Sequence, residues 1–197
     1  MSPPRIAALL VDLDGTLADT EALNAEAYAA ALAETGRIVA PEHLRTLAHG
    51  RSWRDFLPAL VGPEGDAAAI AARKRTLYGA RVGQAAVNEP LVALLRRHHG
   101  GCRTGLVTTA ARDSTLRYLA RPDLTGLFDC VVTGDDVARH KPDPEAYQRA
   151  ATLLGVAPES CLVFEDSPAG LTAARRFGAR VIRVVHPART AVQAVAP

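Results

Sequence analysis

Apolar and polar positions divide the chain into two kinds of segment. Residues 6–11 form a continuous apolar run that ends at the turn Asp12-Leu13-Asp14-Gly15-Thr16. A run that is apolar on both faces and ends at a glycine turn predicts a buried strand of a parallel sheet. Later short apolar segments alternate with helical patterns and predict further strands at 104–108, 128–133, 161–165 and 180–185. We therefore expect an α/β fold built on a parallel sheet.

A helical block separates the first strand from the others. Apolar residues recur at helical spacing, and proline, glycine and charged residues separate the segments. The pattern predicts helices at 20–36, 41–48, 52–61 and 66–82, so that residues 17–88 read as entirely helical. The prediction is a Rossmann-like core of residues 1–16 and 89–197, with an inserted helical-bundle cap domain of residues 17–88.

Two helices in the second half carry their own start and stop signals. Asp143 is placed as an N-cap with Pro144 at the first helical position, and Gly155 ends the helix. Ser167 is likewise a candidate cap before Pro168, in a helix that runs to Gly178. These signals fit helices that connect consecutive strands in the chain.

Composition narrows the class of protein and partner. The 197 residues are 48% apolar and 22% charged, with a formal net charge of +2, which is typical of a folded globular protein. There is no Lys/Arg stripe of the kind that neutralises nucleic-acid phosphates, so we expect no nucleic-acid partner. The N-terminal apolar run is too short to span a membrane and leads into the Asp pair rather than a cleavage site. We expect a cytoplasmic monomer or weak dimer.

Candidate chemistry gathers where the predicted strands end, and parallel pairing brings those ends to one edge of the sheet. The side chains concerned are Asp12 and Asp14, Thr108, Lys141, and Glu165 with Asp166. Because clustered carboxylates repel one another, and because hard oxygen ligands suit Mg²⁺, a divalent ion is implied. A carboxylate nucleophile, a cation and a proton donor are the parts that phosphoryl transfer needs. Taken singly, Thr108 could instead cap a turn, and the Glu165-Asp166 pair could favour a helix N-terminus.

Taken together, these segments resemble the four ordered motifs of the haloacid dehalogenase superfamily. The motifs are Asp12-Leu13-Asp14-Gly15-Thr16-Leu17, Val107-Thr108-Thr109, Lys141-Pro142-Asp143-Pro144 and Phe164-Glu165-Asp166-Ser167-Pro168-Ala169-Gly170. The position of the helical block is similar to that in the helical-cap subgroup, which includes phosphoglycolate phosphatase-like and β-phosphoglucomutase-like enzymes.

The resemblance implies a role for each motif. Asp12 would be the nucleophile that forms an aspartyl-phosphate, and Asp14 the acid that protonates the leaving group and then activates water. Thr108 would hydrogen-bond the phosphoryl oxygens, a function that Thr109 could share or replace. Lys141 would neutralise charge between the nucleophile and the phosphate.

The same resemblance implies the metal ligands. Mg²⁺ would be held by Asp12, by the backbone carbonyl of Asp14 and by Asp166, with Glu165 assisting directly or through water.

The cap holds candidates to face the substrate, for which ordinary surface charge is the competing interpretation. They are Asn24, Arg51, Ser52, Trp53, Arg54, Lys74 and Tyr78. A cluster of cations would suit an anionic or polyhydroxylated group. Lys74 and Tyr78 lie one helical turn apart and could act on one face.

Asp14 argues for phosphate-ester chemistry, because dehalogenases and phosphonate-cleaving relatives depart from the family pattern at this position. β-Phosphoglucomutase-like enzymes have a His and an Arg where this chain has Asn24 and Trp53, which favours a phosphatase. Arg54 could compensate for the missing Arg, so a mutase is the alternative, and a non-catalytic binding protein is a third. The expected substrate is a small phosphorylated metabolite such as a sugar phosphate or phosphoglycolate.

Overall fold

The computed structural model describes residues 5–48 and 51–188. The chain divides into two compact units, a core unit of Met1–Asp19 with Ala86–Pro197 and a cap unit of residues 20–85. The linking segments at 16–17 and 88 are held together within the core unit. The side-chain amide of Asn88 donates to the carbonyl of Thr16 at 3.0 Å, and its backbone N–H donates to that of Leu17 at 2.8 Å.

The core unit contains a five-stranded sheet in the order β5-β4-β1-β6-β7, and all four pairings are parallel. Its strands are β1 (Ala8–Val11), β4 (Arg103–Val107), β5 (Cys130–Val132), β6 (Cys161–Glu165) and β7 (Arg180–Arg183). β1 is central and buried along its length, as its continuous apolar run predicts. The expected α/β fold with a parallel core is confirmed.

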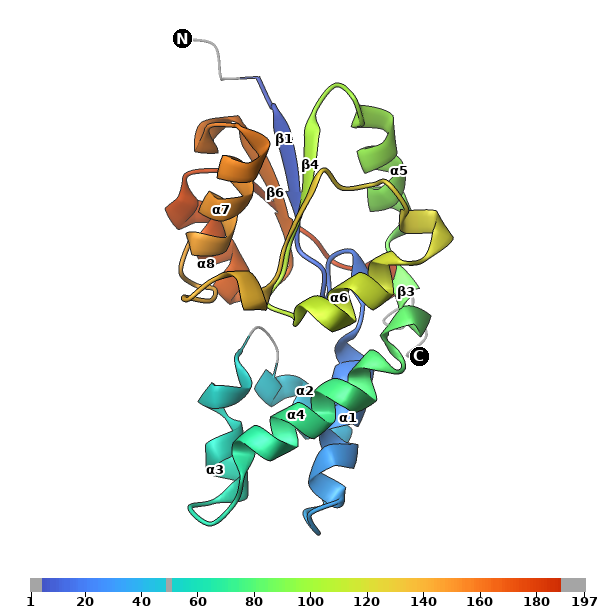
Figure 1. The fold of residues 1–197 in the computed structure, drawn as a ribbon, viewed down its shortest axis with the longest axis vertical. Helices are drawn as coiled ribbons and strands as arrows, with labels where there is room; N and C mark the ends of the chain where they lie inside the picture. Colours follow the sequence, from blue (N-terminus) through green and yellow to red (C-terminus); the bar gives the residue numbers. More distant parts are fainter. Residues whose placement is uncertain (1–4, 49–50, 189–197) are drawn as a thin grey trace, which may run out of the picture. The chain divides into compact units, whose positions relative to one another are not determined.

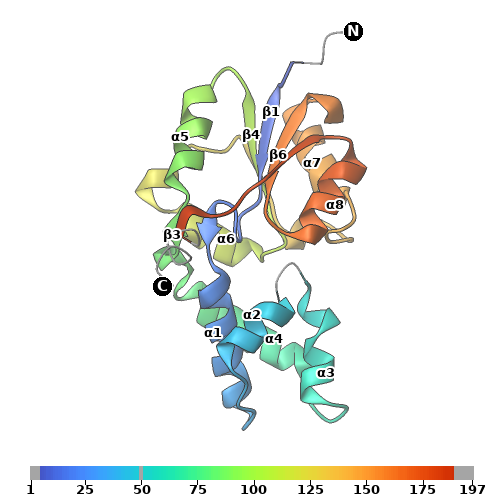
Figure 2. The same cartoon turned by 180° about the vertical axis from the view of Figure 1, so that it is seen from behind.

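Helices cover both faces of this sheet (Figures 1 and 2). The helices α5 (Glu89–His98) and α6 (Arg112–Leu119) lie on one side, and α7 (Glu145–Leu154) and α8 (Pro168–Phe177) lie on the other. Ala8 and Leu10 of β1 belong to the cluster of buried residues that includes Tyr147 of α7 and Phe177 of α8. Because side chains alternate along a strand, Asp12 follows Ala8 and Leu10 on the same face.

Two short strands, β2 (Ala18–Asp19) and β3 (Ala86–Val87), form a small antiparallel pair. In the chain, β2 directly precedes the cap unit and β3 directly follows it. The sequence predicts an entirely helical segment over 17–88, and this is wrong at both ends. These two short strands are far apart in the chain and carry no periodic pattern of their own, so only their pairing defines them.

The cap unit is helical. Its helices are α1 (Glu21–Ala33), α2 (Pro41–Ala48), α3 (Leu57–Val61) and α4 (Ala67–Gly79), with 3₁₀ turns η1 (Trp53–Asp55) and η2 (Val82–Gln84). Its core includes Tyr28 and Phe56, whose rings meet edge to face with centroids 5.3 Å apart. The inserted helical bundle after the first strand is confirmed.

The predicted helix 52–61 is interrupted in the structure. Ser52 accepts from the N–H of Arg54, and the Asp55 carboxylate accepts from the N–H of Ser52 at 3.0 Å. This reciprocal capping closes a short 3₁₀ turn. The α-helical part begins only at Leu57, after Phe56 takes a non-helical conformation with φ −136°.

The predicted start of the helix after Lys141 is also displaced. Asp143 is not the N-cap: Pro144 holds that position and α7 begins at Glu145. The Asp143 side chain still accepts from the Glu145 N–H at 3.0 Å, so it satisfies one of the free donors of the first turn. Gly155, in a left-handed conformation with φ 65°, ends the helix as the pattern predicts.

In the part of the chain that the structure describes, no helix is long and apolar enough to cross a membrane.

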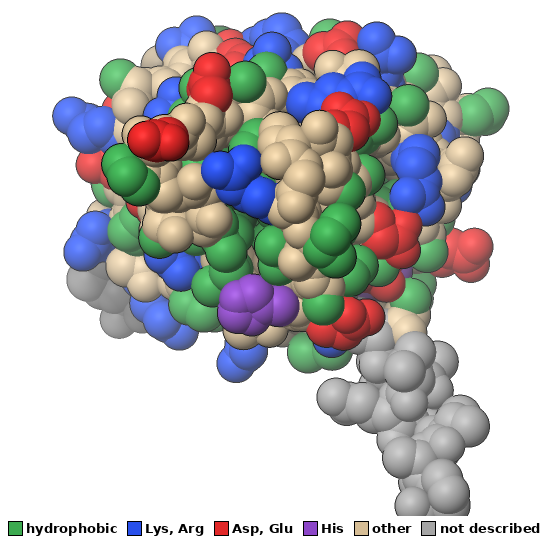
Figure 3. Space-filling view, turned by 90° about the horizontal axis from the view of Figure 1, so that it is seen from below, with side chains coloured by type: hydrophobic (Ala, Val, Ile, Leu, Met, Phe, Trp, Pro, Cys, Tyr) green, Lys and Arg blue, Asp and Glu red, His purple; other side chains and the backbone are tan. Residues whose placement is uncertain are grey.

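Further helical turns of the core unit are η3 (Pro122–Leu124), η4 (Gly134–Asp136) and η5 (Pro158–Ser160). Basic and acidic side chains are interspersed over the face in Figure 3, in line with the 23 basic and 21 acidic residues of the sequence.

Candidate active site

Asp12 lies directly after β1, at the carboxyl end of the central strand. Its N–H donates to the carbonyl of Phe164 in β6 at 3.0 Å, so the parallel pairing continues one residue beyond the strand. The chain then turns at Gly15, whose φ of 87° is left-handed, and the Gly15 N–H donates to the Ala18 carbonyl at 2.7 Å. This tight turn holds Asp12 and Asp14 at the sheet edge.

The Lys141 ammonium is the centre of the site. It donates to Asp12 Oδ1 at 2.6 Å, to Glu165 Oε1 at 2.7 Å and to the carbonyl of Val107 at 3.1 Å. These partners end three neighbouring strands, β1, β6 and β4. The Lys141 side chain is only 4% exposed, so its charge is compensated by the two carboxylates rather than by water.

Glu165 is fully buried, and both of its carboxylate oxygens have protein donors. Besides Lys141, Oε1 lies 3.5 Å from the hydroxyl of Tyr147, while Oε2 accepts from the N–H and the hydroxyl of Ser167 at 2.8 and 3.0 Å. The sequence pattern predicts this role for neither Tyr147 nor Ser167, although Tyr147 lies in the helix that follows Lys141.

The electrostatics of this cluster disfavour ionised Asp12. Burial raises the pKa of Asp12 well above its ordinary value, and the carboxylates of Glu165, Asp166 and Asp14 act in the same direction, against the opposing effect of Lys141. Burial also works to lower the pKa of Lys141, but Asp12 and Glu165 outweigh it and hold that pKa well above its ordinary value. Lys141 is therefore a fixed cation at neutral pH.

Asp14 and Thr108 come together from two strand ends. The Thr108 hydroxyl lies 3.5 Å from Asp14 Oδ2 and accepts from the N–H of Ala110 at 3.0 Å. Thr108 is 1% exposed, whereas Thr109 beside it is exposed. This arrangement brings a hydroxyl and a carboxylate to the same edge as Asp12.

The donor set at this edge fits a hard divalent cation. Asp12 and Asp166 follow the neighbouring strands β1 and β6, each is 6% exposed, and the Thr16 hydroxyl contacts Asp166 Oδ1 at 3.3 Å. The carboxylates of Glu165, Asp166 and Asp14 all act to raise the pKa of Asp12, and a divalent cation would offset the repulsion among these four groups. Within residues 5–48 and 51–188 no three His, Cys, Asp or Glu side chains form a ready metal cluster. Two carboxylates completed by a main-chain carbonyl and waters are the pattern that Mg²⁺ accepts.

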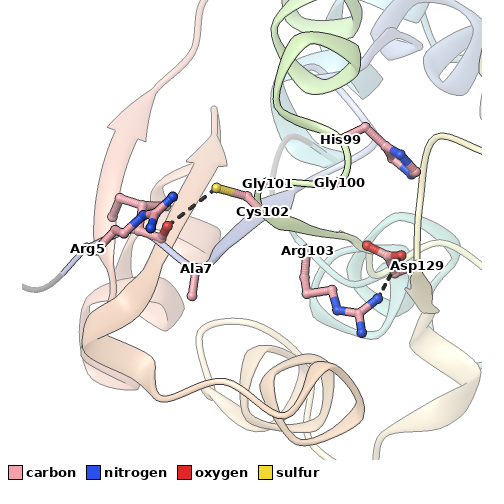
Figure 4. A pocket seen from close by; sticks show the side chains of 9 residues that line it. Arg5, Ala7, His99, Gly100, Gly101, Cys102, Arg103 and Asp129 are labelled. Atoms are coloured by element: carbon pink, nitrogen blue, oxygen red, sulfur yellow. Dashed lines mark hydrogen bonds and ion pairs between the residues drawn. The ribbon is translucent and has the colours of Figure 1, made fainter.

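A cavity of about 430 Å³ lies elsewhere in the core unit (Figure 4). It is lined by residues 5–7, which precede β1, by residues 99–103 between α5 and the start of β4, and by Asp129, which precedes β5. Arg103 points toward Asp129 at 3.4 Å, and the Asp129 carboxylate also accepts from the Thr104 N–H at 2.8 Å. These residues adjoin the amino ends of the strands, so the cavity is separate from the carboxyl edge that carries Asp12.

Lys74 and Arg54, two of the predicted cap residues, contact aromatic rings inside the cap unit. The Lys74 ammonium lies over the rings of Tyr28 and Tyr78, 4.7 and 4.5 Å from their centroids, so Lys74 and Tyr78 do share one face. Arg54 stacks on Trp53 with its guanidinium carbon 4.5 Å from the ring centroid.

Two further cap candidates differ in how they are satisfied. Arg51 donates to the carbonyl of Asp55 at 2.8 Å. Asn24 Oδ1 is buried without a hydrogen-bond partner among the described residues. The roles of the cap residues in substrate binding stay predictions.

The model of the haloacid dehalogenase-like hydrolase family matches residues 6–178. The chain is 30% identical over 182 residues to fructose-1-phosphate phosphatase YqaB of Escherichia coli, covering 91% of this chain and 97% of that protein. It is 32% identical over 173 residues to validoxylamine A 7'-phosphate phosphatase of Streptomyces hygroscopicus subsp. limoneus, covering 86% and 81% of the two chains.

Among solved structures, CbbY from Rhodobacter sphaeroides in complex with phosphate superposes with a TM-score of 0.76 at 30% identity. The match covers 90% of this chain and 85% of that one. A structure of a CbbY variant in complex with xylulose-(1,5)bisphosphate superposes with a TM-score of 0.77, at the same identity and coverage.

Proposed function

The chain belongs to the haloacid dehalogenase-like hydrolase family and is a phosphatase of that family, and from this premise we propose a mechanism and a substrate class. The proposed reaction is Mg²⁺-dependent hydrolysis of a small phosphate monoester through an aspartyl-phosphate on Asp12. The observation that carries it is Lys141, which binds Asp12 at 2.6 Å in a site where Asp14 and Thr108 share the same sheet edge.

In the first half-reaction, a carboxylate oxygen of Asp12 bonds to phosphorus and the bond from phosphorus to the ester oxygen breaks. Asp14 gives its proton to the departing oxygen, which leaves as an alcohol. Lys141 keeps its charge and orients Asp12, because Glu165 and the Val107 carbonyl fix its ammonium. Thr108 would hydrogen-bond a phosphoryl oxygen.

In the second half-reaction, Asp14, now a carboxylate, takes a proton from a water molecule whose oxygen bonds to phosphorus. The acyl-phosphate bond breaks, which returns Asp12 as a carboxylate and releases inorganic phosphate. Asp14 ends protonated, so the cycle closes with one water consumed.

Asp12, the backbone carbonyl of Asp14 and Asp166 would hold Mg²⁺, and the ion would offset phosphate and carboxylate charge at this edge. The family resemblance implies that Glu165 assists the metal, directly or through water. Its four protein contacts support a different proposal, in which it positions Lys141 and Ser167.

We place the substrate among small phosphorylated carbohydrates. The support is that relatives at 30–33% identity carry the names fructose-1-phosphate phosphatase, hexitol phosphatase and phosphoglycolate phosphatase. The cap candidates Asn24, Arg51, Arg54 and Lys74, with Thr109 in the core unit, are the proposed residues for recognising the rest of the molecule.

The test is phosphate release with Mg²⁺ over a panel of esters that includes fructose 1-phosphate, hexitol phosphates and phosphoglycolate. We expect turnover of at least one carbohydrate phosphate, and we expect Asp12→Asn to abolish it because the amide is not a nucleophile. Asp113→Asn is the matched control, since Asp113 is 71% exposed and pairs with Arg117 on the surface. Unchanged turnover in Asp12→Asn would overturn the mechanism.

The same panel separates the alternatives. A mutase of the β-phosphoglucomutase type would convert one sugar phosphate into its isomer without releasing phosphate. A binding protein would turn over no ester in the panel.

A further inference from the structure

The loop that follows β5 packs against the loop that carries Thr108. The Thr108 N–H donates to the carbonyl of Val132 in β5 at 2.9 Å, and the Gly134 N–H donates to the carbonyl of Ala110 at 2.9 Å. The segment Thr133–Asp136 therefore runs alongside Thr108–Ala111 and fixes it through main-chain hydrogen bonds.

Gly134 leaves no room for a side chain at this contact. A Cβ on Gly134 would lie 2.4 Å from the carbonyl oxygen of Thr109 and 3.4 Å from that of Ala110. Its φ is not left-handed, so glycine is needed here for close approach rather than for backbone conformation. The carbonyls of the Thr108 loop thus rest directly on Gly134.

Asp135 supplies a helix cap from outside the helix. The N-cap of α6 is Ala111, which has no polar side chain, and Asp135 Oδ2 accepts from the N–H of Arg112 at 2.8 Å. A carboxylate at this place satisfies a free donor of the first turn and interacts favourably with the positive end of the helix dipole. The end of the Thr108 loop is thereby fixed where it enters α6.

Asp136 and Thr133 stabilise this support in turn. The Asp136 carboxylate accepts from the N–H and the hydroxyl of Thr133 at 2.8 and 2.7 Å, and it pairs with the Arg112 guanidinium. Thr133 is fully buried. The loop is therefore held at both ends and cannot shift without breaking several hydrogen bonds.

We propose that Gly134-Asp135-Asp136 is a positioning segment for phosphoryl binding, which sets the Thr108 hydroxyl and the Thr108–Ala111 main chain in the geometry that receives the phosphate. This inference rests on the proposed function. The segment touches no reacting atom: its effect passes through the Thr108–Ala111 loop and the Arg112 N–H at the start of α6.

The experiment measures orthophosphate binding by calorimetry with Mg²⁺, next to the melting temperature of each variant. We expect Asp135→Ala to weaken phosphate binding about tenfold, the effect of losing one cap on the loop that binds the ligand. Asp135→Asn should recover most of the affinity, because its amide oxygen still accepts from Arg112. Asp113→Asn, in the first turn of the same helix, should bind phosphate as the wild type does.

Gly134→Ala tests the close approach independently, and we expect a larger loss of affinity than for Asp135→Ala. If Gly134→Ala does not fold, the pair Asp135→Ala and Asp135→Asn still decides the matter. Wild-type phosphate affinity in Asp135→Ala, with or without a lower melting temperature, would show that the segment has only a structural role. That result would overturn this inference but not the proposed function. Failure of the wild type to bind phosphate would overturn the proposed function together with it.

Discussion

Lys141 is the residue on which the buried charge of the site depends. It is the ammonium that pairs with both Asp12 and Glu165, and each of the three side chains is at most 8% exposed. Removing one member of a buried ionic group leaves the others desolvated without compensation, which costs about 3–5 kcal/mol. Breaking the contact that is proposed to orient Asp12 is therefore expected to lower stability as well as activity.

We predict that Lys141→Ala abolishes phosphatase activity and lowers the free energy of unfolding by about 3–5 kcal/mol at pH 7. Urea unfolding and phosphate release measure the two effects. Arg139→Ala is the control two residues away, because its side chain is 67% exposed and its ion pairs with Asp143 and Glu145 are worth less than about 1 kcal/mol. Equal free energies of unfolding for the two variants would show that the stability of the protein does not depend on the Lys141 ion pairs.

Gly170 is required by the shape of Glu165. A Cβ at this position would lie 1.8 Å from Glu165 Oε1 and 2.0 Å from its carboxyl carbon. Since Glu165 is fully buried and makes contacts through both oxygens, it cannot move aside without releasing Lys141 or Ser167.

Gly170→Ala is therefore predicted to reduce kcat strongly and to destabilise the protein by about 1–3 kcal/mol, as overpacking does. The control is Gly83→Ala, where an added Cβ meets nothing within 4 Å. Kinetics and thermal melting check both variants. Normal kcat in Gly170→Ala would mean that the Glu165 contacts do not govern Lys141.

At the scale of elements, the junction of β5, η4 and α6 depends on an ionised carboxylate. Partial burial works to raise the pKa of Asp136, but hydrogen bonds from Thr133 and Arg112 outweigh it and lower that pKa from 3.8 to about 2. A shift of this size corresponds to at most about 2 kcal/mol, because the Arg112 side chain that contributes to it is 46% exposed and solvent screens that part. Because the folded pKa is depressed, this stability is present above the unfolded value near 4 and is lost as pH falls toward 2.

Asp136→Asn is expected to lower the free energy of unfolding by up to about 2 kcal/mol at pH 7, with the difference from wild type vanishing near pH 2. Denaturant unfolding between pH 2 and pH 7 measures it. A constant difference over this range would assign the effect to packing rather than to charge.

The same elements show which features of the structure the sequence predicts and which it does not. The apolar run of β1 predicts that Asp12 stands at a strand end, and strand alternation with helices predicts the parallel sheet that brings Glu165 beside it. The helix α7 begins at Glu145 rather than at Pro144, because Pro144 and not Asp143 takes the N-cap position, and the sequence pattern does not distinguish the two. The contacts of Asp135 with Arg112, and of Tyr147 with Glu165, join residues 18 to 23 positions apart, and no periodic pattern encodes them.

At the scale of the whole molecule, the two units differ in what a metal can do for them. Asp12, Asp14 and Asp166 all belong to the core unit of Met1–Asp19 and Ala86–Pro197, and the helices α1 to α4 make up a separate compact unit. A ligand that binds only the folded state stabilises the part of the chain whose unfolding destroys the site. Burial raises the pKa of Asp12 and the neighbouring carboxylates add to that effect, and a bound cation would relieve the repulsion among them.

Mg²⁺ is therefore predicted to raise the melting temperature, and at 100 times its dissociation constant the stabilisation is about 2.7 kcal/mol. Chelation should remove both this gain and the phosphatase activity. Hydrogen exchange should show added protection in β1, β4 and β6 and none in α1–α4. Asp166→Asn should abolish the Mg²⁺ effect while Asp113→Asn keeps it, because only Asp166 stands among the carboxylates that crowd Asp12. A Mg²⁺ effect that persists in Asp166→Asn would place the metal elsewhere in the chain.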